Sequence, residues 1–86
     1  MIEVAFNEAI AREIAGGIRF GAIKTRGGFP VRVLAWDVKS RYCIAGVVQM
    51  GDDECVKQWT ADGKADYRRN VTSSLDLVLQ VEGGEQ

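Results

Sequence analysis

Five side chains have the types and spacing expected of a recognition surface. They are Arg19, Arg26, Arg32, Trp36 and Trp59. An arginine offers a planar fork of N–H donors that matches phosphate and carboxylate groups, and a tryptophan offers a flat ring for stacking. The sequence therefore predicts that these residues bind a small anionic ligand, such as a nucleotide, or an acidic protein surface.

Their positions along the expected strands support this prediction. The arginines lie on or beside the first expected hairpin, together with Lys24. Arg32 and Trp36 share one face of the second strand of that hairpin, and Trp59 shares a face with Lys57 in a later strand. A second interpretation stays open, in which both tryptophans belong to the core and the arginines extend across them, because a chain this small has a thin core.

Catalytic patterns do not accompany this set. The chain has no histidine, so the commonest general base and metal ligand is missing. The serines have no partner in the sequence that would activate a hydroxyl group, and Cys43 and Cys55 have no imidazole to stabilise a thiolate. The sequence therefore predicts that the protein is not an enzyme.

Metal and phosphate motifs are equally weak. Asp52, Asp53 and Glu54 form an acidic turn without the spacing of a calcium loop. Gly27 and Gly28 follow one expected strand and lead into another, whereas a phosphate-binding loop leads into a helix. We therefore expect no metal site and no cofactor.

Composition and charge limit the partners and the location. The chain has 86 residues, and its 11 basic and 12 acidic residues give a net charge of −1. Proteins that bind duplex nucleic acid usually carry a basic excess, so the net charge argues against duplex nucleic acid as the partner. Single-stranded nucleic acid or RNA is an alternative partner, because of the basic hairpin and the tryptophans, but it is not the favoured one. No apolar run is long enough to span a membrane, and the N-terminus does not resemble a secretory signal. We expect a cytoplasmic protein with no membrane partner.

One short helix is predicted over residues 7–15. Asn7 is a suitable N-cap, and Glu8 in the first turn complements the helix dipole. Ile10 and Ile14 lie one turn apart and form a small apolar stripe. The glycine pair that follows at 16–17 predicts the end of the helix.

Strand patterns fill the rest of the chain. The expected strands cover residues 18–25, 31–38, 42–50, 55–60, 66–70 and 75–81, with a bulge near Gly21 and a short charged edge strand at 66–70. The pattern predicts a single domain over 1–86, with a flexible N-terminus at 1–5 and a flexible tail at 82–86. The expected fold is mainly β (α+β): one short N-terminal helix packed on a curled antiparallel sheet or small barrel of five to six strands.

Two details of the pairing follow from the same patterns. Residues 42–50 are apolar on both faces, which is typical of a central strand. A turn centred near Asp52 places Cys55 opposite a residue between Val48 and Met50. Cys43 then lies several residues away, so no disulfide is expected.

Several segments resemble a family of small uncharacterised proteins encoded by phages, prophages and gut bacteria. Residues 25–34 are similar to its T-R-D-G-R-x-V-R-I-L segment, and residues 59–63 to its W/Y-T-x-D-G turn. An apolar strand at 44–48 and the Asp76-Leu77 pair match two further elements, so the resemblance extends from about residue 8 to residue 79. This chain departs from the pattern at Gly27, in place of aspartate, and at Phe29, in place of arginine.

The resemblance implies a phage or prophage origin and a compact β fold, and it implies no reaction. Together with the arginine and tryptophan set, it leads to the hypothesis of a non-enzymatic binding module in the host bacterial cell. Such a module would inhibit host defence by occupying a host protein or by sequestering a small nucleotide-like ligand. The alternatives are a single-stranded nucleic-acid-binding protein and a structural or assembly protein of the phage, which would form a homo-oligomer through an exposed strand edge.

Overall fold

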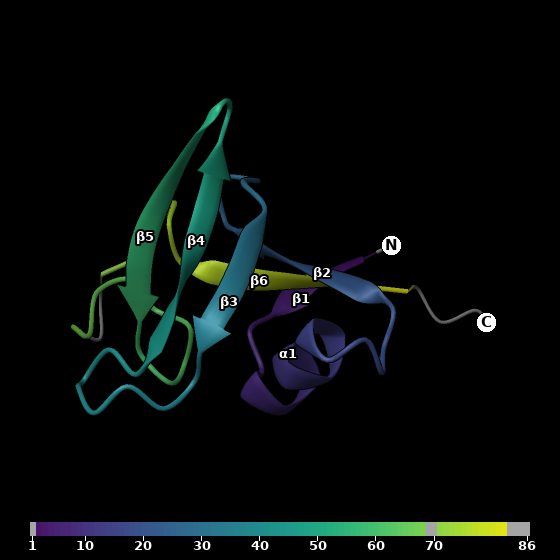
Figure 1. The fold of residues 1–86 in the computed structure, drawn as a ribbon, viewed down its shortest axis with the longest axis horizontal. Coiled ribbons are helices and arrows are strands. Elements are labelled where there is room, and N and C mark those ends of the chain that lie inside the picture. Colours follow the sequence, from purple (N-terminus) through teal and green to yellow (C-terminus); the bar gives the residue numbers. More distant parts are fainter. Residues whose placement is uncertain (1, 69–70, 83–86) are drawn as a thin grey trace.

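The computed structural model describes residues 2–68 and 71–82. Its elements follow one another as β1 (Ile2–Ala5), α1 (Glu8–Ala15), β2 (Gly21–Thr25), β3 (Val31–Ala35), β4 (Ile44–Met50), β5 (Asp53–Trp59) and β6 (Leu77–Val81). The strands form two three-stranded antiparallel sheets, β1–β6–β2 and β3–β4–β5, with α1 beside them (Figure 1). The prediction of a mainly β fold with one short helix is confirmed. No closed barrel is present within the described residues.

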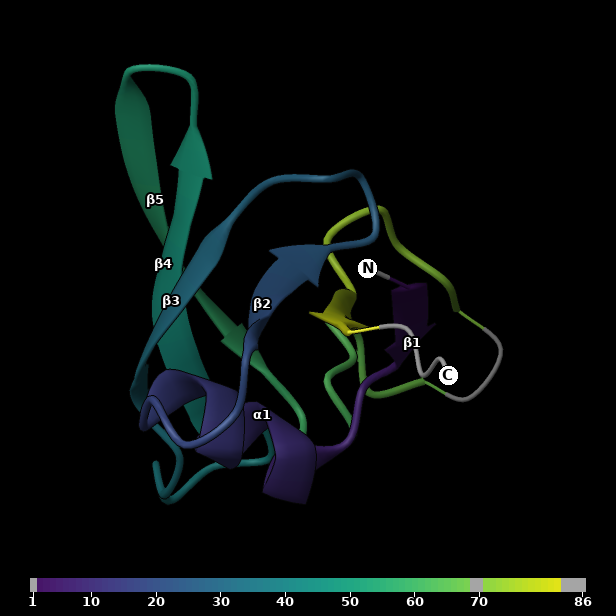
Figure 2. The same ribbon diagram turned by 90° about the vertical axis from the view of Figure 1, so that its right-hand side faces the viewer.

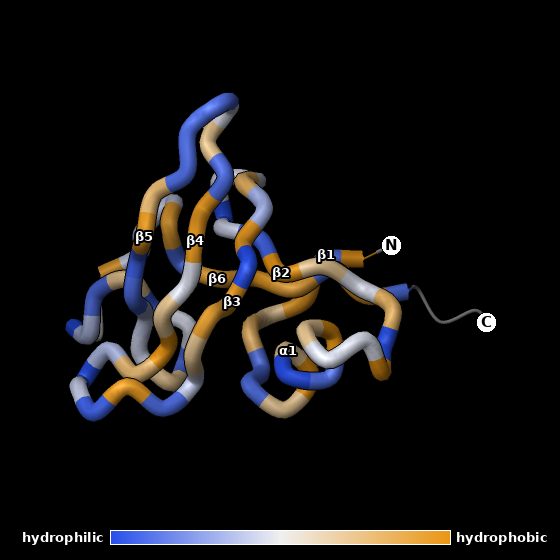
Figure 3. The backbone as a smooth tube through the Cα atoms, viewed as in Figure 1, coloured by the Kyte–Doolittle hydropathy of each residue, from blue (hydrophilic) through white to orange (hydrophobic). Residues whose placement is uncertain are grey.

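The core lies where the two sheets and the helix meet. β6 is central in the first sheet and β4 is central in the second, and both are strongly apolar (Figure 3). Buried side chains from all three parts form one cluster, which contains Ala11, Ile23, Ile44, Val48, Trp59, Leu77 and Leu79. The predicted central position of the 42–50 segment is confirmed.

Local signals placed the helix and one hairpin correctly. The helix begins after Asn7, whose Oδ1 accepts a hydrogen bond from the backbone N–H of Ile10 at 3.1 Å. In the β4–β5 hairpin, Cys55 pairs with Val48, as the turn predicted. Cys43 and Cys55 are both free thiols.

The N-terminal segment differs from its prediction. Residues 1–5 were expected to be flexible, but Ile2–Ala5 forms β1 and pairs with β6. The physical reason is that β6 is buried over residues 77–79, so the backbone N–H and C=O groups on both of its edges need hydrogen-bonded strand partners. β1 supplies one edge and β2 the other.

The first expected strand, at residues 18–25, is shorter than predicted. The prediction of a bulge near Gly21 is wrong. The backbone N–H groups of Ile18 and Arg19 both bond to the carbonyl of Glu13, which extends the end of the helix and delays β2 until Gly21. The β2–β6 register is continuous, so Gly21 is not a bulge. A Cβ there would lie 2.9 Å from Ile14 Cδ1, so the glycine permits close packing of α1 on β2.

The hairpin expected between residues 18 and 38 is also largely absent. β2 pairs with β6 and β3 pairs with β4, and only one bridge, Lys24 to Pro30, joins β2 to β3. The chain therefore passes from one sheet to the other at this turn (Figure 2). β3 ends at Ala35 and contains the register shift, between Val33 and Ala35.

Two expected features near the C-terminus also differ. Residues 66–68 of the expected strand at 66–70 are not in a strand, and residues 69–70 lie outside the described residues. β6 begins at Leu77 rather than at 75, because residues 74–76 form a turn. Of the expected tail at 82–86, only Glu82 is described, and it follows the last strand.

Candidate functional site

Trp59 is a core residue. Its side chain is 0% exposed, and it packs among the central residues of both sheets. Its indole Nε1–H donates a hydrogen bond to the carbonyl oxygen of Leu75 at 2.7 Å, so its only polar group is satisfied inside the protein. For this tryptophan, the interpretation as core applies, and it cannot stack on a ligand at the surface.

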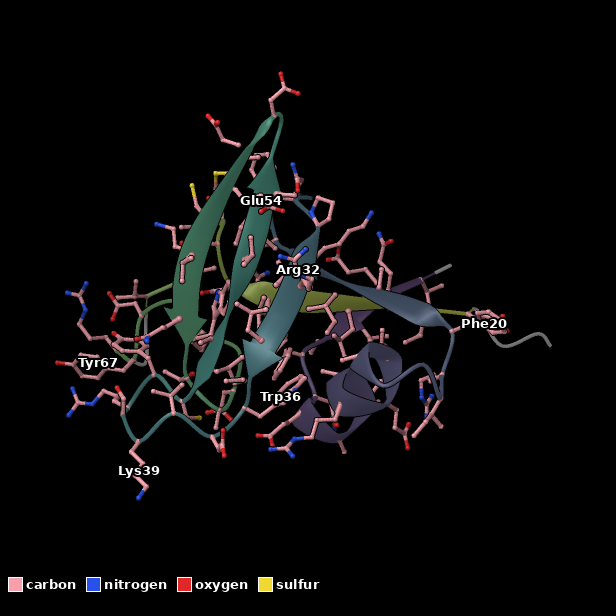
Figure 4. All side chains as sticks on the ribbon, in the orientation of Figure 1. Phe20, Arg32, Trp36, Lys39, Glu54 and Tyr67 are labelled. Carbon is pink, nitrogen blue, oxygen red and sulfur yellow. The ribbon has the colours of Figure 1, made fainter. Side chains whose placement is uncertain are left out.

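Trp36 lies just beyond β3, half-buried against the core, near the lower end of the molecule in the view of Figure 4. The guanidinium of Arg12 in α1 lies 5.3 Å from the centroid of its ring, and Glu8 holds that guanidinium with an ion pair of 2.8 Å. The predicted partner, Arg32, is on the exposed side of β3 instead. The register shift at Leu34 separates the two, because an extra residue in a strand changes which face the later side chains occupy.

The three predicted arginines occupy different places. Arg19 lies between α1 and β2 and pairs with Glu13 at 2.8 Å. Arg26 is exposed in the turn after β2. The side chain of Arg32 is 67% exposed, and its contact with Glu54 is long, at 3.9 Å. The five residues predicted as one site therefore do not converge, and of the five only Arg32 lines the pocket between β2 and β3.

That pocket, here named the β2–β3 pocket, results from the change of sheet between the two strands. β2 and β3 meet at the Lys24–Pro30 bridge and belong to different sheets beyond it, and the end of α1 contributes to the lining. Its volume is about 310 Å³. It is lined by residues 14–15 of α1, residues 21–24 of β2 and residues 30–33.

The charged side chains that line the β2–β3 pocket are both cations. Lys24 and Arg32 are its cations, and every other lining residue is glycine, proline, alanine, isoleucine or valine. No acidic side chain in the described part of the chain is among the lining residues. Among residues 2–68 and 71–82, Glu54 is the only carboxylate that pairs with Arg32, and at 3.9 Å it leaves most of the five guanidinium N–H donors available. The arrangement suits an anionic group attached to an apolar or planar body.

A second cationic and aromatic cluster was missed from the sequence. The rings of Tyr42 and Tyr67 meet edge to face with centroids 6.4 Å apart, and the guanidinium of Arg41 lies 3.9 Å from the centroid of Tyr67. Tyr67 is 54% exposed and lines a pocket of about 360 Å³ with Thr60, Asp62, Lys64 and Arg68. The adjacent pairs Arg41-Tyr42 and Tyr67-Arg68 were the available signal.

The cations of this tyrosine cluster are already engaged. Arg68 pairs with Asp66 at 2.6 Å, and hydrogen bonds from Arg68 lower the pKa of Asp66 to about 2. Lys64 pairs with Asp76 at 3.3 Å, and Arg41 is stacked on the ring of Tyr67. Asp62 adds a negative charge to the pocket. This cluster is therefore less suited to a small anion than the β2–β3 pocket.

Asp76 is the buried charge that fixes the segment before β6. Its carboxylate accepts hydrogen bonds from the backbone N–H of Ala65 at 2.8 Å and of Ser73 at 3.1 Å, and it pairs with Lys64. Burial alone would raise the pKa of Asp76, but these hydrogen bonds and the charge of Lys64 outweigh it, so its pKa is lower than that of an ordinary aspartate. Its backbone carbonyl also accepts from the N–H of Arg26 at 2.7 Å.

Residues 2–68 and 71–82 contain no group of three or more histidine, cysteine, aspartate or glutamate side chains placed to hold a metal ion. Within that part of the chain, no helix has the length and apolar character needed to cross a membrane. No protein-family model, no curated protein and no solved structure matches the chain.

Proposed function

We propose that the protein is a non-enzymatic binding module that sequesters a small anionic, nucleotide-like ligand in the β2–β3 pocket. The observation that carries the proposal is that both Lys24 and Arg32 line a pocket of about 310 Å³ whose other lining residues are apolar. That volume is at the lower end of the range for small-ligand sites, roughly 300–1,000 Å³.

The two cations have different roles in this proposal. Arg32 provides a planar donor fork for two oxygens of a phosphate or carboxylate group, and Lys24 provides a compact charge on a flexible stem. The apolar walls from α1, β2 and β3 bury the uncharged part of the ligand. An anion held between two cations beside an apolar surface is less screened by salt than one on an open surface.

Two observations support a binding role over a catalytic one. The chain contains no histidine. The hydroxyl groups of Ser40 and Ser73 are engaged with local backbone N–H groups, accepting from Tyr42 at 3.2 Å and from Leu75 at 3.0 Å. The resemblance of residues 25–34 to phage and prophage proteins favours a ligand from the bacterial host, and an inhibitor of host defence is the concrete form of the proposal.

Thermal unfolding with added ligand tests the proposal. The probes are cyclic mononucleotides, cyclic dinucleotides, nucleotide sugars and inorganic pyrophosphate. A probe at 100 times its Kd is expected to raise the Tm by on the order of 10 °C, because it binds only the folded protein. The double variant K24Q/R32Q is expected to lose this shift.

The matched control for that experiment is Lys39→Gln, which removes an exposed cation distant from Arg32 (Figure 4). It is expected to keep the full shift. The proposal is wrong if no probe raises the Tm, or if K24Q/R32Q responds as strongly as the unchanged protein.

A second candidate function is binding of single-stranded nucleic acid at the tyrosine cluster. The observation that favours it is the half-exposed ring of Tyr67, which already stacks with Arg41 at 3.9 Å. Bases stack on such rings with little sequence preference. Fluorescence anisotropy with labelled oligo-dT at low salt tests it: Tyr67→Ala should abolish binding, whereas K24Q/R32Q should preserve it. The absence of an anisotropy change in the unchanged protein would reject this candidate.

A further inference from the structure

The outer edge of β5 has no strand partner within residues 2–68 and 71–82. β5 pairs with β4 on one side, and the β4–β5 hairpin projects beyond the rest of the molecule (Figure 1 and Figure 2). Five of the seven residues of β5 are exposed, and Val56 is 72% exposed. A long, exposed edge strand is a template for pairing with another strand.

The turn of the hairpin determines which backbone groups face that edge. Gly51 and Asp52 form a two-residue turn between the paired residues Met50 and Asp53, and Gly51 has φ 63°, as the first position of a type II′ turn requires. The pair that flanks such a turn is hydrogen-bonded, and hydrogen-bonded pairs then alternate along the ladder. The backbone groups of Glu54, Val56 and Gln58 therefore point away from β4.

We infer that this edge pairs, antiparallel and about a two-fold axis at Cys55, with β5 of a second copy of the chain. In this register, Asp53 of each copy faces Lys57 of the other, which gives two cross-strand ion pairs. Glu54 faces Val56 of the other copy, so the backbone groups that point outward meet their counterparts. The β3–β4–β5 sheets of the two copies then form one continuous sheet of six strands.

Charge selects this register over its neighbours. An axis at Glu54 places two carboxylates opposite each other, and an axis at Lys57 places two ammonium groups opposite each other. An axis at Val56 avoids both repulsions but places Lys57 opposite Cys55, so it forms no direct ion pair. The axis at Cys55 alone pairs opposite charges across the strands.

Cys55 provides a built-in reporter of the register. Its own pairing across the axis falls at a position without hydrogen bonds, where facing Cα atoms are about 4.5 Å apart. That distance lies within the range of roughly 4.4–6.8 Å that a disulfide spans. Cys55 is a half-buried free thiol, and the other cysteine, Cys43, lies before β4 and away from the axis.

The inferred dimer does not depend on the proposed ligand site. β3 and β5 are the opposite edges of the β3–β4–β5 sheet, so pairing through β5 leaves the β2–β3 pocket accessible. Failure of ligand binding and failure of dimerisation are therefore separate results.

Sedimentation equilibrium of four proteins tests the inference through a charge swap. The unchanged protein is expected to dimerise. Asp53→Lys and Lys57→Asp each replace two attractive pairs by two repulsive ones, so each should raise the dimer dissociation constant by about tenfold or more. The double variant D53K/K57D restores opposite charges and should return the dissociation constant to within about threefold of the original.

Mild oxidation provides the second measurement. The variant Cys43→Ser, oxidised with copper phenanthroline, should form a covalent dimer through Cys55, whereas Cys55→Ser should form none. Adding Asp53→Lys to the Cys43→Ser variant should make the cross-link through Cys55 much weaker. The inference is overturned if the protein remains a monomer at millimolar concentration, if the double charge variant fails to recover the dimer, or if the cross-link forms through Cys43 instead.

Discussion

The surroundings of Asp76 and the β2–β3 pocket use charge in opposite ways. Asp76 is 1% exposed, and its carboxylate is saturated by two backbone N–H groups and Lys64. Lys24 and Arg32 line a pocket that no acidic side chain of the described residues lines, and the nearest carboxylate to Arg32 is that of Glu54, at 3.9 Å. The first charge is satisfied within the chain, and the second pair is the one that we propose binds a ligand.

This difference separates folding from recognition. A buried charge is retained only when hydrogen bonds compensate for its lost hydration, so removing Asp76 disturbs the fold. A cation without a close ion-pair partner stabilises the fold little, so under the proposal the loss of half-buried Lys24 or exposed Arg32 should affect mainly ligand binding. The same molecule therefore allows the two roles to be tested against each other.

The largest expected effect comes from Asp76. We expect Asp76→Ala to lower the free energy of unfolding by about 3 kcal/mol, because two backbone N–H groups and Lys64 lose their acceptor. Urea unfolding monitored by far-UV circular dichroism measures this change. Asp66→Asn is the matched control, since that carboxylate pairs with Arg68 at the surface, and its unfolding midpoint should barely move. Equal effects of the two variants would contradict the distinction.

Trp59 is expected to have the next largest effect. Trp59→Phe removes the hydrogen bond to the Leu75 carbonyl and leaves unfilled volume in the core, so we expect a loss of about 2 kcal/mol. Trp36→Phe should cost less than half of this, because that ring is only half-buried. Urea unfolding of the two variants measures the difference. A larger loss for Trp36→Phe would show that the two tryptophans have been assigned to the wrong roles.

Acid should weaken the same buried region. The pKa of Asp76 is lower in the folded protein than in the unfolded chain, so its contribution is fully present above the unfolded value, about 3.9, and is lost as the pH falls through the folded value. Stability measured by urea unfolding between pH 7 and pH 2 should decline below about pH 4. Asp76→Asn should show a shallower decline. An identical acid dependence in both proteins would remove Asp76 as its source.

The smallest effect on folding should come from the pocket itself. We expect K24Q/R32Q to change the free energy of unfolding by less than about 0.5 kcal/mol, because both side chains lack a close, buried partner. Urea unfolding of this variant and of the unchanged protein measures this change. A loss comparable to that of Asp76→Ala would mean that these cations stabilise the fold rather than serve a ligand.

The sequence predicted those parts of the fold that depend on neighbouring residues. The cap at Asn7, the central position of the apolar segment predicted at 42–50 and the pairing of Cys55 with Val48 all follow from local signals, and all are confirmed. The two-sheet arrangement depends instead on β6, which lies more than fifty residues after β2 in the chain and pairs with it. Local patterns could not show that partner, so the expected β2–β3 hairpin was wrong.

The candidate site was predicted only in part for the same reason. Arg32 was selected by residue type and does line the pocket. Its separation from Trp36 follows from a register shift in β3, which depends on the pairing with β4. Trp36 instead meets Arg12, a helix residue whose position depends on how α1 packs against the sheets. The carbonyl that satisfies Trp59 is likewise sixteen residues away.

A ¹H–¹⁵N HSQC NMR titration with inorganic pyrophosphate most directly tests the central claim that the β2–β3 pocket binds an anion. Pyrophosphate carries the anionic groups that nucleotide-like ligands share, and backbone amides report where it binds. The largest shifts are expected at residues 22–24 and 31–33, saturating with a single Kd and disappearing in K24Q/R32Q. Largest shifts around Arg41 and Tyr67, or small shifts spread evenly over all exposed cations, would contradict a specific anion site in the β2–β3 pocket.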